Sequence, residues 1–170
     1  MILNLPIEVE RSMDAAQGWL GLGDPLSARQ ELEQIPASLN SHPRVLLVHS
    51  ELFAATKRWE ESSAYAHAAL QTAPDLWDGW IKRSYALHEI KRTREAFDLL
   101  LPAAKKFPDL WLVPYNLACY SAQLNLLEDA ETWFDRALKI DAKNVKHAAH
   151  DDPDLIPLKK RATSSNFGEI

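Results

Sequence analysis

The stretch WDGWIKRSYALHEIKRTREAFDLLLPAAKKFPDL, residues 77–110, sets the organisation of the chain, because its small residues recur at intervals of 34. Two series of small residues keep this spacing: Ala16, Ser50, Ser84 and Ala118, and Ala28, Ser62, Ala96 and Ala130. A third series runs through Ala69, Ala103 and Ala137, with Ile35 as its one large member. Four units fit the period without a gap: 9–42, 43–76, 77–110 and 111–144. A fixed period of this length indicates a chain built from structural repeats.

The pattern inside the units resembles the tetratricopeptide repeat family, whose consensus is W-x2-L-G-x2-Y, then A-x3-F, then P. The third unit carries Trp80, Ser84, Leu87, Ala96, Leu100 and Pro108 at these places, and the fourth carries Leu117, Ala118, Ala130 and Phe134. The departures are Ile35 for an alanine, Ser121 for an aromatic residue and Ala142 for a proline. The stretches VPYNLACY and DDPDLIPL also resemble a recurring ending of short bacterial tetratricopeptide proteins.

The resemblance implies an all-α fold, a right-handed α-solenoid of four tetratricopeptide-like helix-turn-helix repeats with a C-terminal capping helix. Small residues would let the two helices of a unit approach closely, and stacked units would bury the apolar faces that one pair cannot bury. The expected helices are 9–22, 25–35, 43–56, 59–72, 77–90, 93–106, 111–124 and 127–140. Pro102 removes the hydrogen bond to the carbonyl of Asp98, which predicts a kink in its helix.

Both ends of the chain are expected to protect the repeats. Residues 1–8 are an apolar segment in which Ile2, Leu3, Leu5 and Ile7 cover the first helix or meet a partner. Residues 145–161 are predicted to form the C-terminal cap, and 162–170 a flexible tail. Asp152 followed by Pro153 is typical of a helix N-cap with proline at the first helical position. Leu155, Ile156 and Leu158 are expected to dock on the fourth repeat.

Composition indicates one soluble domain, expected in the cytoplasm. The 170 residues include a single cysteine, so no disulfide within the chain is possible. The formal net charge of −5 disfavours nucleic acid as a partner, since binding it requires a basic surface. The longest apolar runs are too short to span a bilayer, and the N-terminus lacks a basic, then apolar, signal pattern. Neither nucleic acid nor a membrane is therefore an expected partner.

Family geometry places one row of side chains from the first helix of each unit in a concave groove. The candidate groove residues are Met13, Gln17, Arg44, Leu47, Glu51, Ile81, Lys82, Tyr85, Glu89, Leu112, Tyr115, Asn116 and Cys119. An open apolar strip is expected through Met13, Leu47, Ile81, Tyr85, Leu112 and Tyr115, with acidic flanks that favour a basic partner. Tyr85 and Tyr115 are predicted to lie close together on the open face as aromatic anchors. The strip could instead be filled by the N-terminal segment or by a second copy of the chain.

These features predict a non-enzymatic protein interaction module that binds a peptide or helix, with a self-associating scaffold as the alternative. Cys119 is interpreted as a buried structural residue, because no histidine is paired with it in the sequence. His147 and His150, three residues apart, could share a metal, but we favour the interpretation that they belong to a polar capping helix. No cofactor and no metal is predicted. Trp19, Phe53, Trp59 and Phe134 are assigned to the core.

Overall fold

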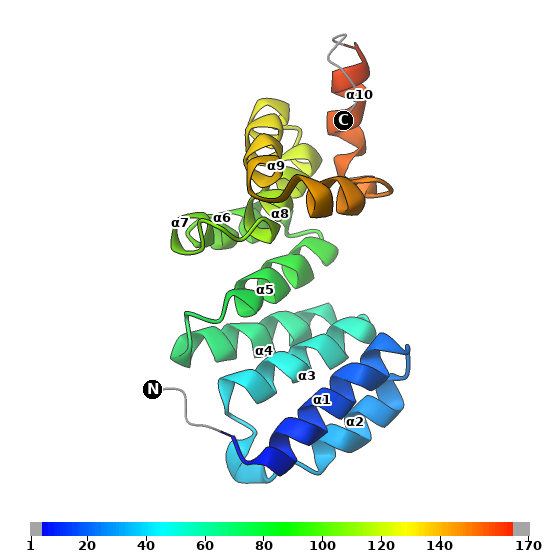
Figure 1. Ribbon diagram of the computed structural model, residues 1–170, viewed down its shortest axis with the longest axis vertical. Helices are drawn as coiled ribbons and strands as arrows, with labels where there is room; N and C mark the ends of the chain where they lie inside the picture. The colour runs from blue at the N-terminus through cyan, green and yellow to red at the C-terminus, as the bar shows by residue number, and fades with distance from the viewer. Residues whose placement is uncertain (1–4, 165–170) are drawn as a thin grey trace. The chain divides into compact units, whose positions relative to one another are not determined.

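The structure is a computed structural model that describes residues 5–164, with side chains up to residue 161, and every regular element in that range is helical (Figure 1). The chain divides between Ile90 and Lys91 into two compact units, called unit 1 and unit 2. Each unit is built from helices that pack in antiparallel pairs, and the first helix of a pair is called its A helix and the second its B helix. The all-α prediction is confirmed.

Unit 1 contains two complete helix pairs and one further A helix. Its elements are α1 (Ile7–Gly21), α2 (Pro25–Glu33), the short η1 (Ala37–Leu39), α3 (Pro43–Ala55), α4 (Trp59–Thr72) and α5 (Trp77–Glu89). The A helices α1, α3 and α5 form a row, since α1 contacts α3 (Figure 1) and α3 in turn contacts α5. The B helices α2 and α4 each pack against the A helices before and after them. One row of three A helices therefore forms a continuous face of unit 1.

Small residues allow the close approach of helices within unit 1, as the sequence predicted. Ala16 of α1 and Ala28 of α2 are fully buried. In the next pair, Ser50 Oγ donates a hydrogen bond of 2.9 Å to the carbonyl oxygen of Ser62, so two small polar residues replace the two alanines. At Gly79 of α5, a Cβ atom would lie 2.9 Å from Leu70 Cδ2. These contacts leave no room for larger side chains, which explains the small residues of the repeat.

The period of 34 also appears in the backbone. The residues with a left-handed conformation are Gly23 (φ 78°), Lys57 (φ 58°), Lys91 (φ 66°) and Asn125 (φ 60°). They are spaced by 34 residues, and each one follows the end of the A helix of its own 34-residue repeat. A left-handed residue after a helix satisfies its last carbonyl groups, and glycine adopts this conformation without steric cost. Only the first of the four turns uses glycine, so the other three carry a small conformational strain.

The N-terminal segment contributes to the core of unit 1. Leu5 is buried in a cluster with Val9, Met13 and residues of α2 and α3. Ile7, in contrast, begins α1 with its side chain 55% exposed. Ile2 and Leu3 lie outside the described residues. The predicted cover of the first helix is therefore confirmed for Leu5, whereas for Ile7 only the alternative, contact with a partner, remains a prediction.

Unit 2 contains the remaining helices and the C-terminal cap. Its elements are α6 (Thr93–Leu100), α7 (Ala103–Lys106), α8 (Leu112–Gln123), α9 (Leu127–Ala149), the short η2 (Pro153–Leu155) and α10 (Ile156–Ser164). The predicted kink at Pro102 is confirmed, because the helix is interrupted there between α6 and α7. α9 also kinks, at Asp141 (φ −152°, ψ 81°), and continues to Ala149. The extension beyond the predicted end at residue 140 buries Val145 and Ala149.

Two predictions about large side chains are wrong. Trp19, assigned to the core, is 38% exposed, because it lies in the last turn of α1 next to the exposed residues Leu22 and Gly23. Ile156, expected to dock on the fourth repeat, is 46% exposed. Its neighbours Leu155 and Leu158 are each only 1% exposed and pack as predicted. Phe134 is buried as predicted, whereas Phe53 and Trp59 are half-buried.

Candidate interaction surfaces

The first candidate surface is the row of side chains that α1, α3 and α5 present in unit 1. We call it the unit 1 face, and it consists of Glu10, Asp14, Gln17, Arg44, Glu51, Asp78, Ile81, Lys82, Tyr85 and Glu89. Seven of these residues were predicted as groove positions from the family pattern: Gln17, Arg44, Glu51, Ile81, Lys82, Tyr85 and Glu89. All ten lie in unit 1, whose A helices are in contact.

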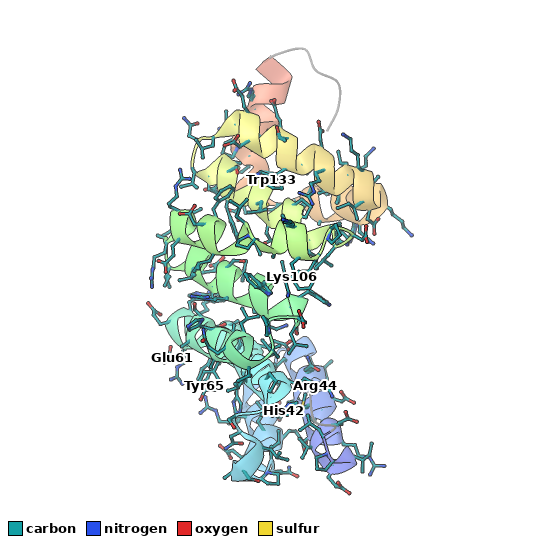
Figure 2. The ribbon with its side chains drawn as sticks, turned by 90° about the vertical axis from the view of Figure 1, so that its left-hand side faces the viewer. His42, Arg44, Glu61, Tyr65, Lys106 and Trp133 are labelled. Atoms are coloured by element: carbon teal, nitrogen blue, oxygen red, sulfur yellow. The ribbon has the colours of Figure 1, made fainter. Side chains whose placement is uncertain are left out.

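Polar side chains on the unit 1 face are linked across the A helices by hydrogen bonds. Arg44, near the start of α3 (Figure 2), donates a hydrogen bond of 2.8 Å from Nη1 to Glu10 Oε1 on α1. Gln17 Nε2 donates to both carboxylate oxygens of Glu51, at 3.1 and 3.0 Å. Each of these two pairs joins residues 34 apart, so the repeat brings equivalent places of successive A helices together.

The network reaches the third A helix through a lysine. Lys82 Nζ lies 3.0 Å from Glu51 Oε1 and 3.2 Å from Asp78 Oδ2. Exposed ion pairs of this kind add only about 0–1 kcal/mol each to stability. Their main effect is therefore to hold the side chains of the face in defined positions.

The apolar strip expected in this region is largely closed. Met13 and Leu47 are each 3% exposed and belong to the hydrophobic clusters of unit 1, so their assignment to an open surface is wrong. They face the neighbouring helices because adjacent A helices pack directly on each other. Ile81 is half-buried. Tyr85 alone is well exposed, at 42%, and its ring meets that of Trp59 edge-on with centroids 5.7 Å apart.

The unit 1 face is acidic. It carries the five carboxylates Glu10, Asp14, Glu51, Asp78 and Glu89 against the two cations Arg44 and Lys82, a formal charge of −3. Asp14 and Glu89 form no ion pair with any residue in the range 5–161, whereas the other three carboxylates are paired. Two carboxylates are therefore available to a basic partner.

The second candidate surface lies on α8 and has a different character. Tyr115 is 7% exposed and Cys119 is 3% exposed, so the prediction that they line an open groove is wrong. The chain's own segment around η2 packs against α8 and covers them. Tyr115 Oη donates a hydrogen bond of 2.5 Å to Asp152 Oδ2, and Cys119 Sγ lies 3.6 Å from the same oxygen. Leu112 and Asn116 are half-buried, and Asn116 Nδ2 donates to the carbonyl of Leu112.

The environment of α8 keeps both donors protonated. Burial and the hydrogen bond to Asp152 raise the pKa of the Tyr115 hydroxyl above its ordinary value of 10.0. Burial, together with the charge of Asp152, raises the pKa of the Cys119 thiol well above its ordinary value of 9.0. A reactive cysteine needs the opposite shift, toward the thiolate. The predicted burial of Cys119 is therefore confirmed.

A cleft on the B-helix side of unit 1 was not predicted. It has a volume of about 480 Å³ and is lined by residues of α2, α3 and α4 that include Arg29, His49 and Phe53. Tyr65, on α4, also lines it and is labelled in Figure 2. The Tyr65 ring lies 5.3 Å from His49 and 5.0 Å from Phe53, measured between centroids. Burial, and to a smaller extent Arg29, lowers the pKa of His49 below its ordinary value of 6.5. The cleft therefore holds a neutral histidine.

Between residues 5 and 161 no group of three or more His, Cys, Asp or Glu side chains is placed to hold a metal ion. His147 and His150 are both exposed at the end of α9. No helix in the described range combines the length and apolar character needed to cross a bilayer.

Comparison with known proteins identifies the fold and no closer relationship. No protein-family model matches the sequence, and no curated protein matches it. Solved structures of MamA are similar over nearly the whole chain. MamA of strain AMB-1 has a TM-score of 0.66 at 16% identity and covers 95% of this chain and 91% of its own. MamA from residue 41 to its end, from Desulfovibrio magneticus RS-1, has a TM-score of 0.73 at 16% identity and covers 96% and 89%. MamA of strain MSR-1 has a TM-score of 0.64 at 16% identity and covers 95% and 98%.

MamA has the tetratricopeptide fold, and the likeness extends from the first helix pair of this chain to its C-terminal helices. Together with the 34-residue period of sequence and backbone, it shows that the chain has an all-α helical-repeat fold of the tetratricopeptide type.

Proposed function

We propose that the chain is a non-enzymatic protein interaction module and that its unit 1 face binds a segment of a partner protein. The observation that carries the proposal is the exposed Tyr85 ring, held edge-on against Trp59 beside the ordered polar network of Glu51 and Lys82. Aromatic side chains that are held in place bind with little loss of conformational entropy and are frequent anchors of interfaces.

The charge of the face indicates the chemistry of the partner. Asp14 on α1 and Glu89 on α5 are the carboxylates without ion pairs in the described range, and they lie on the outer two A helices of the row. A partner segment that crosses the row of A helices could contact Asp14, Tyr85 and Glu89 together. It would carry lysine or arginine near both ends, to pair with the two carboxylates, and an apolar residue to pack on the Tyr85 ring. Charge complementarity of this kind mainly raises the rate of association and its dependence on salt.

The proposal is tested on partners captured from a lysate of the native organism and then titrated as purified proteins or peptides. Tyr85→Ala should weaken binding at least about tenfold, as expected for the loss of a central anchor. Leu26→Ala is the matched control, because Leu26 is 66% exposed but lies on the B helix α2. Equal loss for both variants, or no loss for Tyr85→Ala, would exclude the unit 1 face as the binding surface.

A charge test uses the two carboxylates without ion pairs. Asp14→Lys combined with Glu89→Lys should slow association with a basic partner and reduce its salt dependence. Glu51 is a poor choice for such a test, because a lysine there would stand beside Lys82 and disturb the network of the free protein.

Self-association is the alternative function, with a second copy of the chain in place of a foreign partner. Light scattering over a wide range of concentrations distinguishes the two. A mass that stays at one chain at every concentration excludes the scaffold, whereas a larger mass that Tyr85→Ala returns to one chain would make the second copy the ligand of the unit 1 face.

A further inference from the structure

The segment that follows α9 is held on α8 by polar contacts around one aspartate. Asp152 Oδ2 accepts the hydrogen bond of 2.5 Å from Tyr115 and lies 3.6 Å from the sulfur of Cys119. Its other oxygen, Oδ1, accepts a hydrogen bond of 2.9 Å from the backbone N–H of Asp154, which fixes the turn at Pro153. Gln123 Nε2 donates a further hydrogen bond of 2.9 Å to the carbonyl oxygen of Asp154.

The apolar side of the same segment is equally well seated. Leu155 and Leu158 are each 1% exposed, whereas Ile156 between them is 46% exposed. Asp152, Leu155 and Leu158 are spaced by three residues, so one side of a helical turn carries all three contacts. The segment is therefore bonded to α8 through the Asp152 carboxylate, and its two buried leucine side chains anchor it in the interior of unit 2.

The place of these contacts in the repeat resembles a ligand site. In the fourth repeat (111–144), the fifth, ninth and thirteenth places are Tyr115, Cys119 and Gln123. In the third repeat (77–110), the same places are Ile81, Tyr85 and Glu89, all of which belong to the unit 1 face. The segment thus covers in unit 2 the row of places that is open in unit 1.

We propose that the row Tyr115, Cys119 and Gln123 on α8 is a second recognition surface, specific for an acidic turn of the type Asp-Pro-x-Leu. Residues 150–158 occupy it as a ligand within the same chain, and a partner that carries this type of turn binds when the segment is displaced. The inference does not depend on the proposed function of the unit 1 face.

The chemistry of the α8 row selects an anion. Two neutral donors, a hydroxyl and a thiol, point at one carboxylate oxygen, and burial keeps both protonated. A basic side chain in place of Asp152 would face two hydrogen-bond donors and have no acceptor. The α8 row therefore takes a ligand of the opposite charge to that expected for the acidic unit 1 face.

Attachment within the chain gives the segment an advantage over a partner. A short connection typically produces an effective concentration in the millimolar range, against which a partner has to compete. A variant that weakens the internal segment should therefore make the surface available at much lower concentrations of a partner peptide.

The single cysteine of the chain supplies a specific measurement. Cys119 lies under Asp152, so its rate of modification by a thiol reagent reports how often residues 150–158 leave α8. In the full chain, Asp152→Ala should raise this rate about tenfold or more, since it removes a hydrogen bond to a charged group. Asp151→Ala is the matched control, because the Asp151 side chain is 93% exposed, and its rate should stay that of the natural chain.

Recognition is then tested with a peptide. The probe is the blocked peptide HDDPDLIPL, the sequence of residues 150–158, added at about 1 mM to the full-length Asp152→Ala variant. It should return the modification of Cys119 toward the slow rate, and the peptide HDAPDLIPL should not. Protection by neither peptide, or by both equally, would overturn the proposed specificity.

A second measurement separates release of the segment from unfolding. Modification of Cys119 in Asp152→Ala should depend only weakly on urea at concentrations that leave the helical signal unchanged, because release of nine residues exposes little surface. A rate that rises with urea as steeply as global unfolding does would show that residues 150–158 are an integral part of the fold, and the proposal would be wrong.

Discussion

The unit 1 face and the α8 row occupy corresponding places of the repeat, yet one is open and acidic, whereas the other is covered and presents neutral hydrogen-bond donors. The difference in accessibility arises from the neighbouring side chains of each surface. On the unit 1 face, Glu51 and Lys82 bond to each other and leave Tyr85 exposed. On α8, Tyr115 and Cys119 are buried under Asp152. The family pattern thus determines where a side chain is placed, and contacts from outside the pattern determine whether it is accessible.

The largest expected effect contrasts the two tyrosines. Tyr115→Ala removes a buried ring and leaves Asp152 without its strongest donor, so it should lower the free energy of unfolding by about 3–5 kcal/mol. Tyr85→Ala removes an exposed ring and should cost less than about 1 kcal/mol. Urea denaturation followed by circular dichroism measures both. Similar losses for the two variants would remove the distinction between the covered and the open surface.

The next effect tests whether the two regions share the same helix packing beneath their different surfaces. Ala28 in α2 and Ala130 in α9 hold equivalent places and are both fully buried. Ala28→Leu and Ala130→Leu should each overpack the contact between paired helices and cost about 1–3 kcal/mol. An unchanged melting temperature for either variant would show that its pair is not packed in the repeat register.

The free energy of unfolding should depend on pH in two ranges, an alkaline range set by the α8 row and an acid range set by His49 in the cleft of unit 1. The raised pKa values of Cys119 and Tyr115 mean that the unfolded state loses protons first. Stability therefore falls as the pH rises above 9 for Cys119 and above 10 for Tyr115, by up to about 1.4 kcal/mol per pH unit for each group. The lowered pKa of His49 has the reverse consequence. The unfolded state binds a proton first, so stability falls as the pH drops below 6.5.

Urea midpoints between pH 5 and pH 10 measure both arms of this profile. Tyr115→Phe combined with Cys119→Ala should flatten the alkaline arm and leave the acid arm in place. His49→Gln should reduce the acid arm alone. A profile in which the double variant loses stability above pH 9 as the natural chain does would show that these two groups are not its cause.

The smallest effect concerns the turns, which the two regions share. Lys57→Gly should stabilise the chain by about 0.5–1 kcal/mol, since glycine relieves the left-handed strain at φ 58°. Asn125→Gly should gain less, because asparagine tolerates this conformation better than lysine does. Thermal unfolding of the two variants gives the comparison, and a loss of stability for Lys57→Gly would mean that its side chain stabilises the turn more than the strain destabilises it.

The repeat, the helix starts and the break at Pro102 could be predicted because each follows from local sequence. Close helix contacts require small residues at a fixed spacing, and proline interrupts helical hydrogen bonds wherever it stands. Exposure was harder to predict. Met13 and Leu47 keep the groove spacing but pack between adjacent A helices, and a spacing alone does not state how near the next helix lies.

The contact between Tyr115 and Asp152 could not be derived from the repeat at all. It joins residues 37 apart, one inside the periodic part of the chain and one beyond it, so no equivalent pair exists in another unit. The N-cap at Asp152 was recognisable, since aspartate before proline has a local cause. Which helix that turn would cover depends on the kink at Asp141, for which the sequence carries no proline or glycine.

The left-handed turns have a consequence for proteolysis. Lys57 and Lys91 stand at the exposed ends of A helices, and an arginine follows each of them. Trypsin cleaves after lysine and arginine, and exposed turns are cut before the interiors of helices. Brief digestion of the folded chain should therefore release the fragment 58–91, which has the length of one repeat, so that the protease measures the structural period directly.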